Sequence, residues 1–424
     1  MPRLPVLLAA LLLVAVPAPA FGGVTADAPT LSGDTTAATS PVELGDVDGS
    51  ATNVLLLDGP QTSGFARADT AVTVTVAASH TDLDGRYSTY DFEARWAAAS
   101  NDSERLAVVR NATDAAANWT ADIASDEATA REAYLDGDIS AGALVRQVAL
   151  DSARADALAN YLATVRERTS ALSEENASEM RSRIAALRGE IAAYGAGTDG
   201  SLRDELAAAV AGDRPPIRVY VAASENGLVL AALDDGTYYH TTYRVDNYDA
   251  APAPNVDLGA FLESLQRLYP TTMNLSASNG GRQSFGAPAD AHLYQAVLGY
   301  SRTTDVQSTL VVYFDPSTNS VYREDKRLAT DDIVTRDAVT RTEDNTTLVV
   351  NRTYAGGPLR VAVQNATGAP LTAAVRVNGT PVGTTDPDTG AVWALSPAGA
   401  YNVTAERGET TVTINTTAVD PTSD

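Results

Sequence analysis

The spacing of the apolar residues changes near residue 215, and this change limits which folds the chain can adopt. From residue 144 to residue 194, apolar residues recur at alternating steps of four and three, which places them on one stripe of a helix. From Ile217 onward they alternate with polar residues, as in a half-buried strand. The sequence therefore predicts a helical hairpin or bundle followed by regions built from strands. The stripe comprises Leu144, Val148, Asp151, Ala155, Leu158, Leu162, Val165, Thr169 and Leu172, then Met180, Ile184, Leu187, Ile191 and Tyr194.

The helical region is predicted over residues 84–214, and capping residues mark its internal ends. Gly195 follows the last stripe residue, at a position where a left-handed C-cap is favoured. Ser201 with Asp204 has the spacing of a capping box, which starts a further short helix. Asp151 interrupts the apolar stripe, so we expect a short hairpin or bundle rather than a long coiled coil.

The N-terminal residues carry the signals of export. Residues 1–20 are predicted to be a cleaved signal peptide, because a basic start and the apolar stretch Leu4–Val16 precede small residues. That stretch is shorter than the roughly 20 residues that cross a bilayer. No integral membrane segment is therefore expected after its removal. Residues 21–50 have the composition of a flexible linker.

Strands are predicted on both sides of the helical region. Residues 51–83 form a predicted short β segment, with strands at Thr52–Leu57 and Ala71–Ala77, the second of which has alternating valines. Residues 215–330 combine hairpin signals with an amphipathic helix at Asp257–Tyr269. This combination predicts an α+β domain in which one antiparallel sheet carries a helix on a face.

The last part of the chain is predicted to be a linker at 331–344, a β-sandwich at 345–418 and a tail at 419–424. Tight turns separate its short strands, and its most characteristic segments are Gly368–Leu371, Ala374–Gly379, Thr384–Asp386, Gly390 and Pro397–Val403. These segments resemble the carboxypeptidase regulatory-like family. The resemblance implies a small prealbumin-like sandwich that stiffens or presents and brings no catalytic residues. The predicted fold class is thus a helical hairpin or bundle, an antiparallel α+β domain and an all-β immunoglobulin-like sandwich.

Asparagine-x-Ser/Thr triplets are far more frequent than chance allows. Given the serine and threonine content, about three would be expected if the motif had no meaning. The excess predicts an N-glycosylated protein that lies outside the cell or at its surface, because a glycan needs an exposed acceptor. The eleven triplets begin at Asn101, Asn111, Asn118, Asn176, Asn274, Asn345, Asn351, Asn365, Asn378, Asn402 and Asn415.

The charge composition is strongly one-sided. The formal net charge is -24, and Lys326 is the one lysine. With the alanine-rich helices and the motif Tyr134–Ser140, this composition resembles exported proteins of salt-loving archaea built from domains of unknown function. An acidic surface keeps such proteins soluble in brine, although an ordinary acidic surface is the alternative. Nucleic acid is not expected as a partner, because phosphate binding needs a basic face.

No sequence motif for catalysis, a cofactor or a metal is present. The chain lacks cysteine, which excludes disulfides and cysteine-ligated zinc. His240 and His292 fall in the α+β region, where two histidines without a third ligand are more typical of ordinary strand or surface positions than of a metal site or an acid–base pair. Gly281–Gly286 is one residue too long for the nucleophile elbow of a serine hydrolase. A glycosidase needs two carboxylates, and sequence alone selects no pair from 54 acidic residues.

Tyrosine is the one residue type concentrated in the α+β region, which holds ten of the 17. Tyr239, Tyr243 and Tyr313 are candidates for an aromatic face that binds a sugar or a peptide, although tyrosine also suits half-buried strands. The favoured function is a non-enzymatic surface or secreted protein with a structural, presentation or interaction role. Its expected partners are other surface proteins or envelope glycans, and the oligomeric state is left open. The alternative is an exported hydrolase with catalytic carboxylates in the α+β region.

Overall fold

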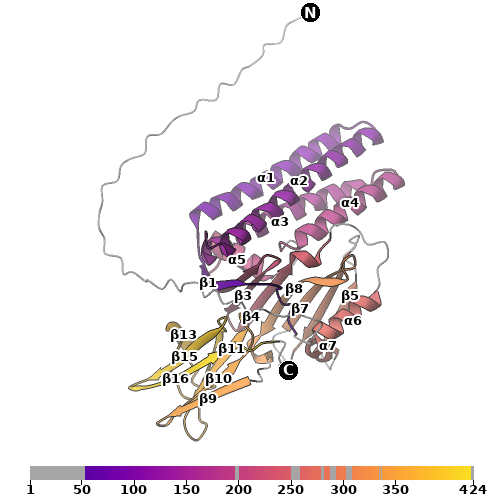
Figure 1. The fold of residues 1–424 in the computed structure, drawn as a ribbon. Helices are drawn as coiled ribbons and strands as arrows, with labels where there is room; N and C mark the ends of the chain where they lie inside the picture. Colours follow the sequence, from indigo (N-terminus) through magenta and orange to yellow (C-terminus); the bar gives the residue numbers. More distant parts are fainter. Residues whose placement is uncertain are drawn as a thin grey trace, which may run out of the picture. The chain divides into compact units, whose positions relative to one another are not determined.

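The computed structural model describes residues 53–195, 200–249, 258–277, 281–286, 293–301, 308–333, 335 and 337–421. The predicted signal peptide and linker lie outside these residues. Within them the chain forms a helical region, an antiparallel sheet with two further helices, and a β-sandwich (Figure 1). The predicted fold class is confirmed. In the described part, no helix is both long and apolar enough to span a bilayer.

The helical region packs long helices against one another. The stripe predicted for 144–194 follows α3 and α4 and the turns that end them, and its members are buried. Most of its apolar residues lie in the core shared with α1 and α2, whereas Leu144 and Val148 lie in the core near α5 and the sheet. The predicted capping box at Ser201 and Asp204 starts α5, and Gly195 has a positive φ of 110°. The helices are α1 (Val72–Ala98), α2 (Asp102–Leu135), α3 (Ala141–Thr169), α4 (Glu174–Ala192) and α5 (Leu202–Ala211).

The prediction for the segment before the helices was wrong in its details. Ala71–Ala77, predicted as a strand, contains the N-cap and the first turns of α1. The valines recur at every second position over too short a stretch to decide between strand and helix, and packing against α3 favours the helix. Residues 53–57 form no strand, and the strand of this segment is β1 at Thr62–Ala68.

The strands between Thr62 and Ala329 form an antiparallel sheet with the order β1-β2-β3-β4-β8-β7-β6-β5. The helical region covers one face, whereas α6 and α7 cover part of the other (Figure 1). The helix predicted at 257–269 is thus observed as α6. The bounds are β2 (Ile217–Ser224), β3 (Gly227–Asp234), β4 (Thr237–Arg244), α6 (Leu258–Leu268), α7 (Pro270–Ala277), β5 (Arg282–Gly286), β6 (Tyr294–Tyr300), β7 (Ser308–Asp315) and β8 (Ser320–Ala329), with short 3-10 turns at Val245–Asn247 and Thr330–Asp332.

The C-terminal sandwich buries an apolar core between two sheets. One sheet contains β14, β11, β10 and β9, and the other contains β13, β12, β15 and β16. The sandwich begins at β9, which lies inside the segment predicted as a linker. The prediction missed this strand because β9 is a polar edge strand that lacks an apolar pattern. The bounds are β9 (Asp337–Glu343), β10 (Thr346–Arg352), β11 (Pro358–Gln364), β12 (Ala374–Val377), β13 (Thr380–Thr384), β14 (Ala391–Leu395), β15 (Ala400–Arg407) and β16 (Thr410–Thr417).

Candidate functional site

Ionisable side chains gather on the face of the sheet that points away from the helical region. The strands β4 and β8 are neighbours, with His240 opposite Lys326 and Thr242 opposite Glu324. Since alternate residues of a strand share a face, these four side chains and Tyr238 lie together. His240, Glu324 and Lys326 are 2%, 0% and 6% exposed.

Glu324 is the centre of this buried cluster. Its Oε1 lies 3.1 Å from His240 Nε2 and accepts a 3.0 Å bond from Lys326 Nζ. Its Oε2 accepts a 2.9 Å bond from the backbone N–H of Leu55. Lys326 also donates to the carbonyl of Asn53 at 2.7 Å. The cluster therefore fixes the extended segment that precedes β1 against the sheet.

The same cluster reaches the sandwich through two tyrosines. The Tyr238 hydroxyl lies 3.0 Å from His240 Nδ1 and donates to the carbonyl of Gly356 at 3.1 Å. It also lies 3.3 Å from the hydroxyl of Tyr354. Tyr354 and Gly356 belong to the turn between β10 and β11, so polar contacts join this end of the sandwich to the centre of the sheet.

Burial and charge set the protonation of the cluster. Burial lowers the pKa of His240, which favours neutral imidazole. Burial alone would raise the pKa of Glu324, but Lys326 and His240 outweigh it and lower that pKa to about 2. Glu324 thus remains a carboxylate paired with an ammonium group. Because these groups are buried and bonded to one another, the cluster is suited to holding segments together rather than to meeting a substrate.

A second set of buried charges lies between the helices and the opposite face of the sheet. Arg203 on α5 forms two bonds of 2.6 and 2.9 Å with Glu127 on α2, and both side chains are buried. On α3, Asp151 accepts bonds from Gln147 and Arg154. Burial, helped by the charge of Glu127, raises the pKa of Asp151 to about 7. Asp151 had a sequence signal, because it and Thr169 are the polar members of the stripe. The pairing of Arg203 with Glu127 had none.

The three candidate tyrosines do not form an open binding face. Tyr239, Tyr243 and Tyr313 are 7%, 5% and 5% exposed. Tyr243 and Tyr313 lie in the core beneath α3 and α4, whereas Tyr239 belongs to the separate core near α5. The prediction of a ligand-binding face at these rings was therefore wrong, because the helical region covers the face that carries them.

The remaining candidates for chemistry are not brought together. His80 is exposed on α1, where its Nδ1 lies 2.8 Å from Asp84, and His292 lies outside the described residues. Among the described residues, no three His, Asp or Glu side chains gather closely enough to hold a metal ion. A cavity of about 110 Å³ near the segment that precedes β1 is lined by residues that include Arg244 and Arg267 but no carboxylate.

All eleven predicted glycosylation sites lie in the described part of the chain, and none of their asparagines is buried. Asn176 lies in the first turn of α4. Asn365 has its Oδ1 bonded to both the N–H and the hydroxyl of Thr367. The exposed asparagines are Asn101, Asn111, Asn118, Asn274, Asn345, Asn378 and Asn415, and the half-buried ones are Asn176, Asn351, Asn365 and Asn402.

Family comparisons divide the chain into three segments. The model named Domain of unknown function (DUF7096) matches residues 1–215, just over half of the chain. The chain belongs to the DUF7096 family. The model named Family of unknown function (DUF7094) matches residues 219–334. The DUF7096 segment contributes β1 to the sheet whose other strands lie in the DUF7094 segment, so the two share one sheet.

The third match is an archaeal fibronectin-III type-like domain at residues 337–418. This match confirms the predicted β-sandwich and supports an archaeal origin. The sandwich family that it names differs from the carboxypeptidase regulatory-like family that the sequence resembles. The match begins with β9, as the sandwich in the structure does. No curated protein and no solved structure matches the chain.

Proposed function

We propose that this is an exported, N-glycosylated protein of the cell surface or the surrounding medium, with a structural or presentation role rather than an enzymatic one. The observation that carries the proposal is the position of the eleven glycosylation triplets. They occur on the helical region, on α7 and throughout the sandwich, and none of their asparagines is buried. A glycan could be attached at such positions without opening a core.

The contact between the sandwich and the sheet supports a presenting role. Leu395 of β14 packs among Tyr220, Val229 and Tyr238 of the sheet, and the Tyr238 hydroxyl bonds to Gly356. Apolar burial and a buried hydrogen bond at one contact hold the sandwich at a fixed position on the sheet. A glycosylated sandwich held in this way could present its outer face to other surface proteins or to envelope glycans.

The hydrolase alternative gains no support from the described residues. In the α+β region, Glu324 is paired with Lys326 and His240. Asp325 lies 2.7 Å from Arg323. These buried carboxylates face bases rather than each other, so they do not form the acid and base pair of a glycosidase.

The test is the mass of the protein recovered from the medium and the envelope of its native host. We expect a chain that starts near Phe21 and carries glycan mass, with glycopeptides mapped to the triplet asparagines. Asn319 is exposed but begins no triplet, so it serves as the internal control and should carry no glycan. An unmodified chain that retains its leader and stays inside the cell would overturn the proposal.

A further inference from the structure

The helix α1 exposes large apolar side chains along one stripe. Val72, Val76, Leu83, Tyr87 and Tyr90 are 75%, 63%, 63%, 70% and 73% exposed. At 3.6 residues per turn, these positions fall within an arc of roughly 60°. Scattered single apolar residues are ordinary on a protein surface, but large apolar residues gathered on one side of a helix mark an interaction site.

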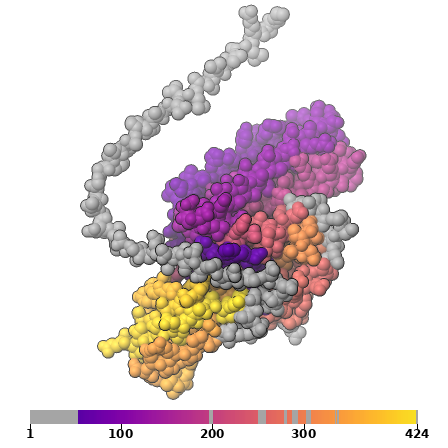
Figure 2. Space-filling model, in the orientation of Figure 1, coloured from indigo at the N-terminus to yellow at the C-terminus, as the bar shows by residue number. Residues whose placement is uncertain are grey.

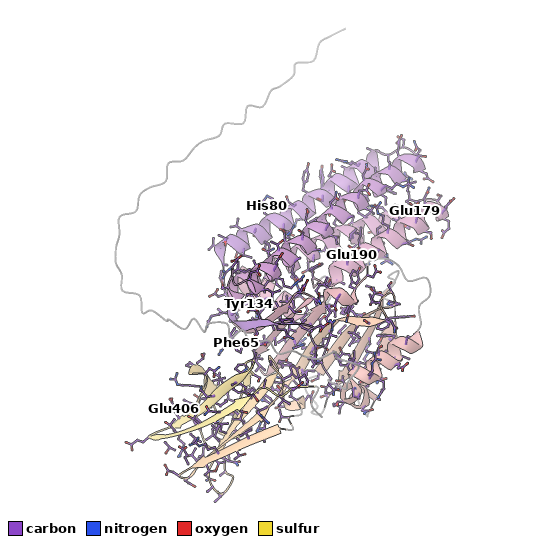
Figure 3. All side chains as sticks on the ribbon, viewed as in Figure 1. Phe65, His80, Tyr134, Glu179, Glu190 and Glu406 are labelled. Carbon is purple, nitrogen blue, oxygen red and sulfur yellow. The ribbon has the colours of Figure 1, made fainter. Side chains whose placement is uncertain are left out.

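The opposite side of α1 explains why the stripe points outward. The side facing α3 is closely packed at Gly85, where an added Cβ would lie 3.2 Å from the Cβ of Ala157, and it buries Phe92 further along. Close packing at Gly85 leaves no space for a larger side chain at that point. His80, on the flank of the stripe, lies on the outer side of α1 (Figure 3). In Figure 2, α1 forms part of the outer surface of the helical region.

We infer that the stripe binds the stripe of a second copy of this chain, with the two α1 helices antiparallel. Reversing the helix sets Val72 against Tyr90 and, within one residue, Val76 against Tyr87, while Leu83 meets Ser79 or His80 of the other copy. A small side chain then meets a large one at each of these pairs, as close packing requires. A symmetric contact of this kind closes a dimer.

Area favours a second copy as the occupant, and ion pairs along α1 reduce the charge repulsion that would oppose it. The chain has a formal net charge of -24, so most of its surface would repel another copy. On α1, however, Asp82 pairs with Arg86 and Asp91 pairs with Arg95, each at 2.9 Å. Glu93 pairs with Arg168 of α3 at 2.9 Å. Covering the stripe on both copies would remove on the order of 1,000 Å² from water, near the lower end for specific interfaces.

The first experiment measures the mass of the full chain in molar KCl by light scattering, across micromolar to submillimolar concentrations. We expect the parent to have twice the mass of one chain. The variant Val76→Gln/Leu83→Gln/Tyr87→Gln should have the mass of a single chain. Val245→Gln/Phe285→Gln is the control, since Val245 and Phe285 are also exposed apolar residues but lie outside α1. A monomeric parent, or a triple variant that still dimerises, would overturn the inference.

The second experiment tests the antiparallel arrangement, and the lack of native cysteine makes it simple. Val72→Cys/Tyr90→Cys should form intermolecular disulfides on oxidation. Neither single variant should do so, because residues 72 and 90 lie about 27 Å apart along a helix. Cross-linking by Tyr90→Cys alone would show a parallel pairing and contradict the arrangement.

Discussion

At the scale of single residues, burial rather than sequence motif decides what the ionisable side chains do. Asp151 would be an ordinary acid on a helix surface, but it lies inside the helical core beside Glu127. Lys326, the one lysine of the chain, is buried with its amine bonded to Glu324 and to the carbonyl of Asn53. A compact ammonium group with three donors suits that position.

Replacing Asp151 by Asn should change how stability depends on pH. The folded pKa of about 7 lies above the ordinary value of 3.8 for an aspartate. Between these values the unfolded chain loses a proton that the folded chain keeps, so the parent loses stability as pH rises from about 4 to about 7. Asn cannot ionise. The stability of Asp151→Asn relative to the parent should therefore increase across this window, by an amount on the order of a few kcal/mol, and level off above it.

Denaturant unfolding at a series of pH values, with salt held constant, would check this prediction. Asp122→Asn is the matched control, because Asp122 is exposed on the neighbouring helix α2. The difference between Asp122→Asn and the parent should stay small at every pH. If the difference between Asp151→Asn and the parent is also independent of pH, then Asp151 does not hold its proton in the folded state.

At the scale of elements, the sequence predicted the helices and strands whose own residue pattern shows which side is buried. The stripe on α3 and α4 and the capping box of α5 were visible because spacing and capping chemistry are local. The helix α1 was partly missed because large apolar residues in its first turns, such as Val72, Val76 and Leu83, point outward rather than into a core. The strand β9 was missed because its residues are mostly polar.

The candidate site was less accessible to sequence than the elements were. The contacts of His240 with Glu324 and of Arg203 with Glu127 join residues on different elements, and local patterns do not encode such pairings. The three tyrosines were correctly assigned to strands but wrongly assigned to an open face. Which face the helices would cover follows from tertiary packing, which overrides the local tendency of tyrosine.

The turn that joins the sandwich to the sheet should not tolerate a side chain at Gly356. Its φ is 76°, and an added Cβ would lie 2.5 Å from the ring of Tyr220. Gly368 has a similar φ of 84° with open space around it, so Gly368→Ala is the matched control. Both variants strain the backbone, but we expect Gly356→Ala to cost roughly 1–3 kcal/mol more, because of the added overpacking.

Two measurements check the prediction for Gly356→Ala. The first is denaturant unfolding of both variants. The second is acylation of Lys326 by an amine-reactive reagent, followed by peptide mapping, which reports the opening of the contact because the chain has no other lysine. Faster labelling in Gly356→Ala than in Gly368→Ala is expected. Equal stability and equal labelling would show that the sheet does not require close approach at this glycine.

At the scale of the whole molecule, the acidic charge should make folding depend on salt. A formal net charge of -24 destabilises a compact state by self-repulsion. Salt at about 1 M screens this repulsion within about 3 Å. We expect the melting temperature to rise as KCl increases to molar concentration, and an uncharged osmolyte such as sucrose to produce a smaller rise. A cooperative melt that is the same at low and molar KCl would contradict the salt-loving character proposed from the composition.

The placement of β1 also constrains the order in which the molecule can fold. Its residue Thr62 pairs with Ala223 of β2, and the helices α1 to α5 lie between the two strands in the chain. During synthesis β1 therefore emerges long before its partner, and its hydrogen-bonding groups stay unpaired until β2 appears. The helices can form from local contacts in the meantime and bring the two ends of that long loop together. An interruption of synthesis before β2 would leave a helical intermediate with an unpaired strand, which is the kind of species that aggregates or recruits chaperones.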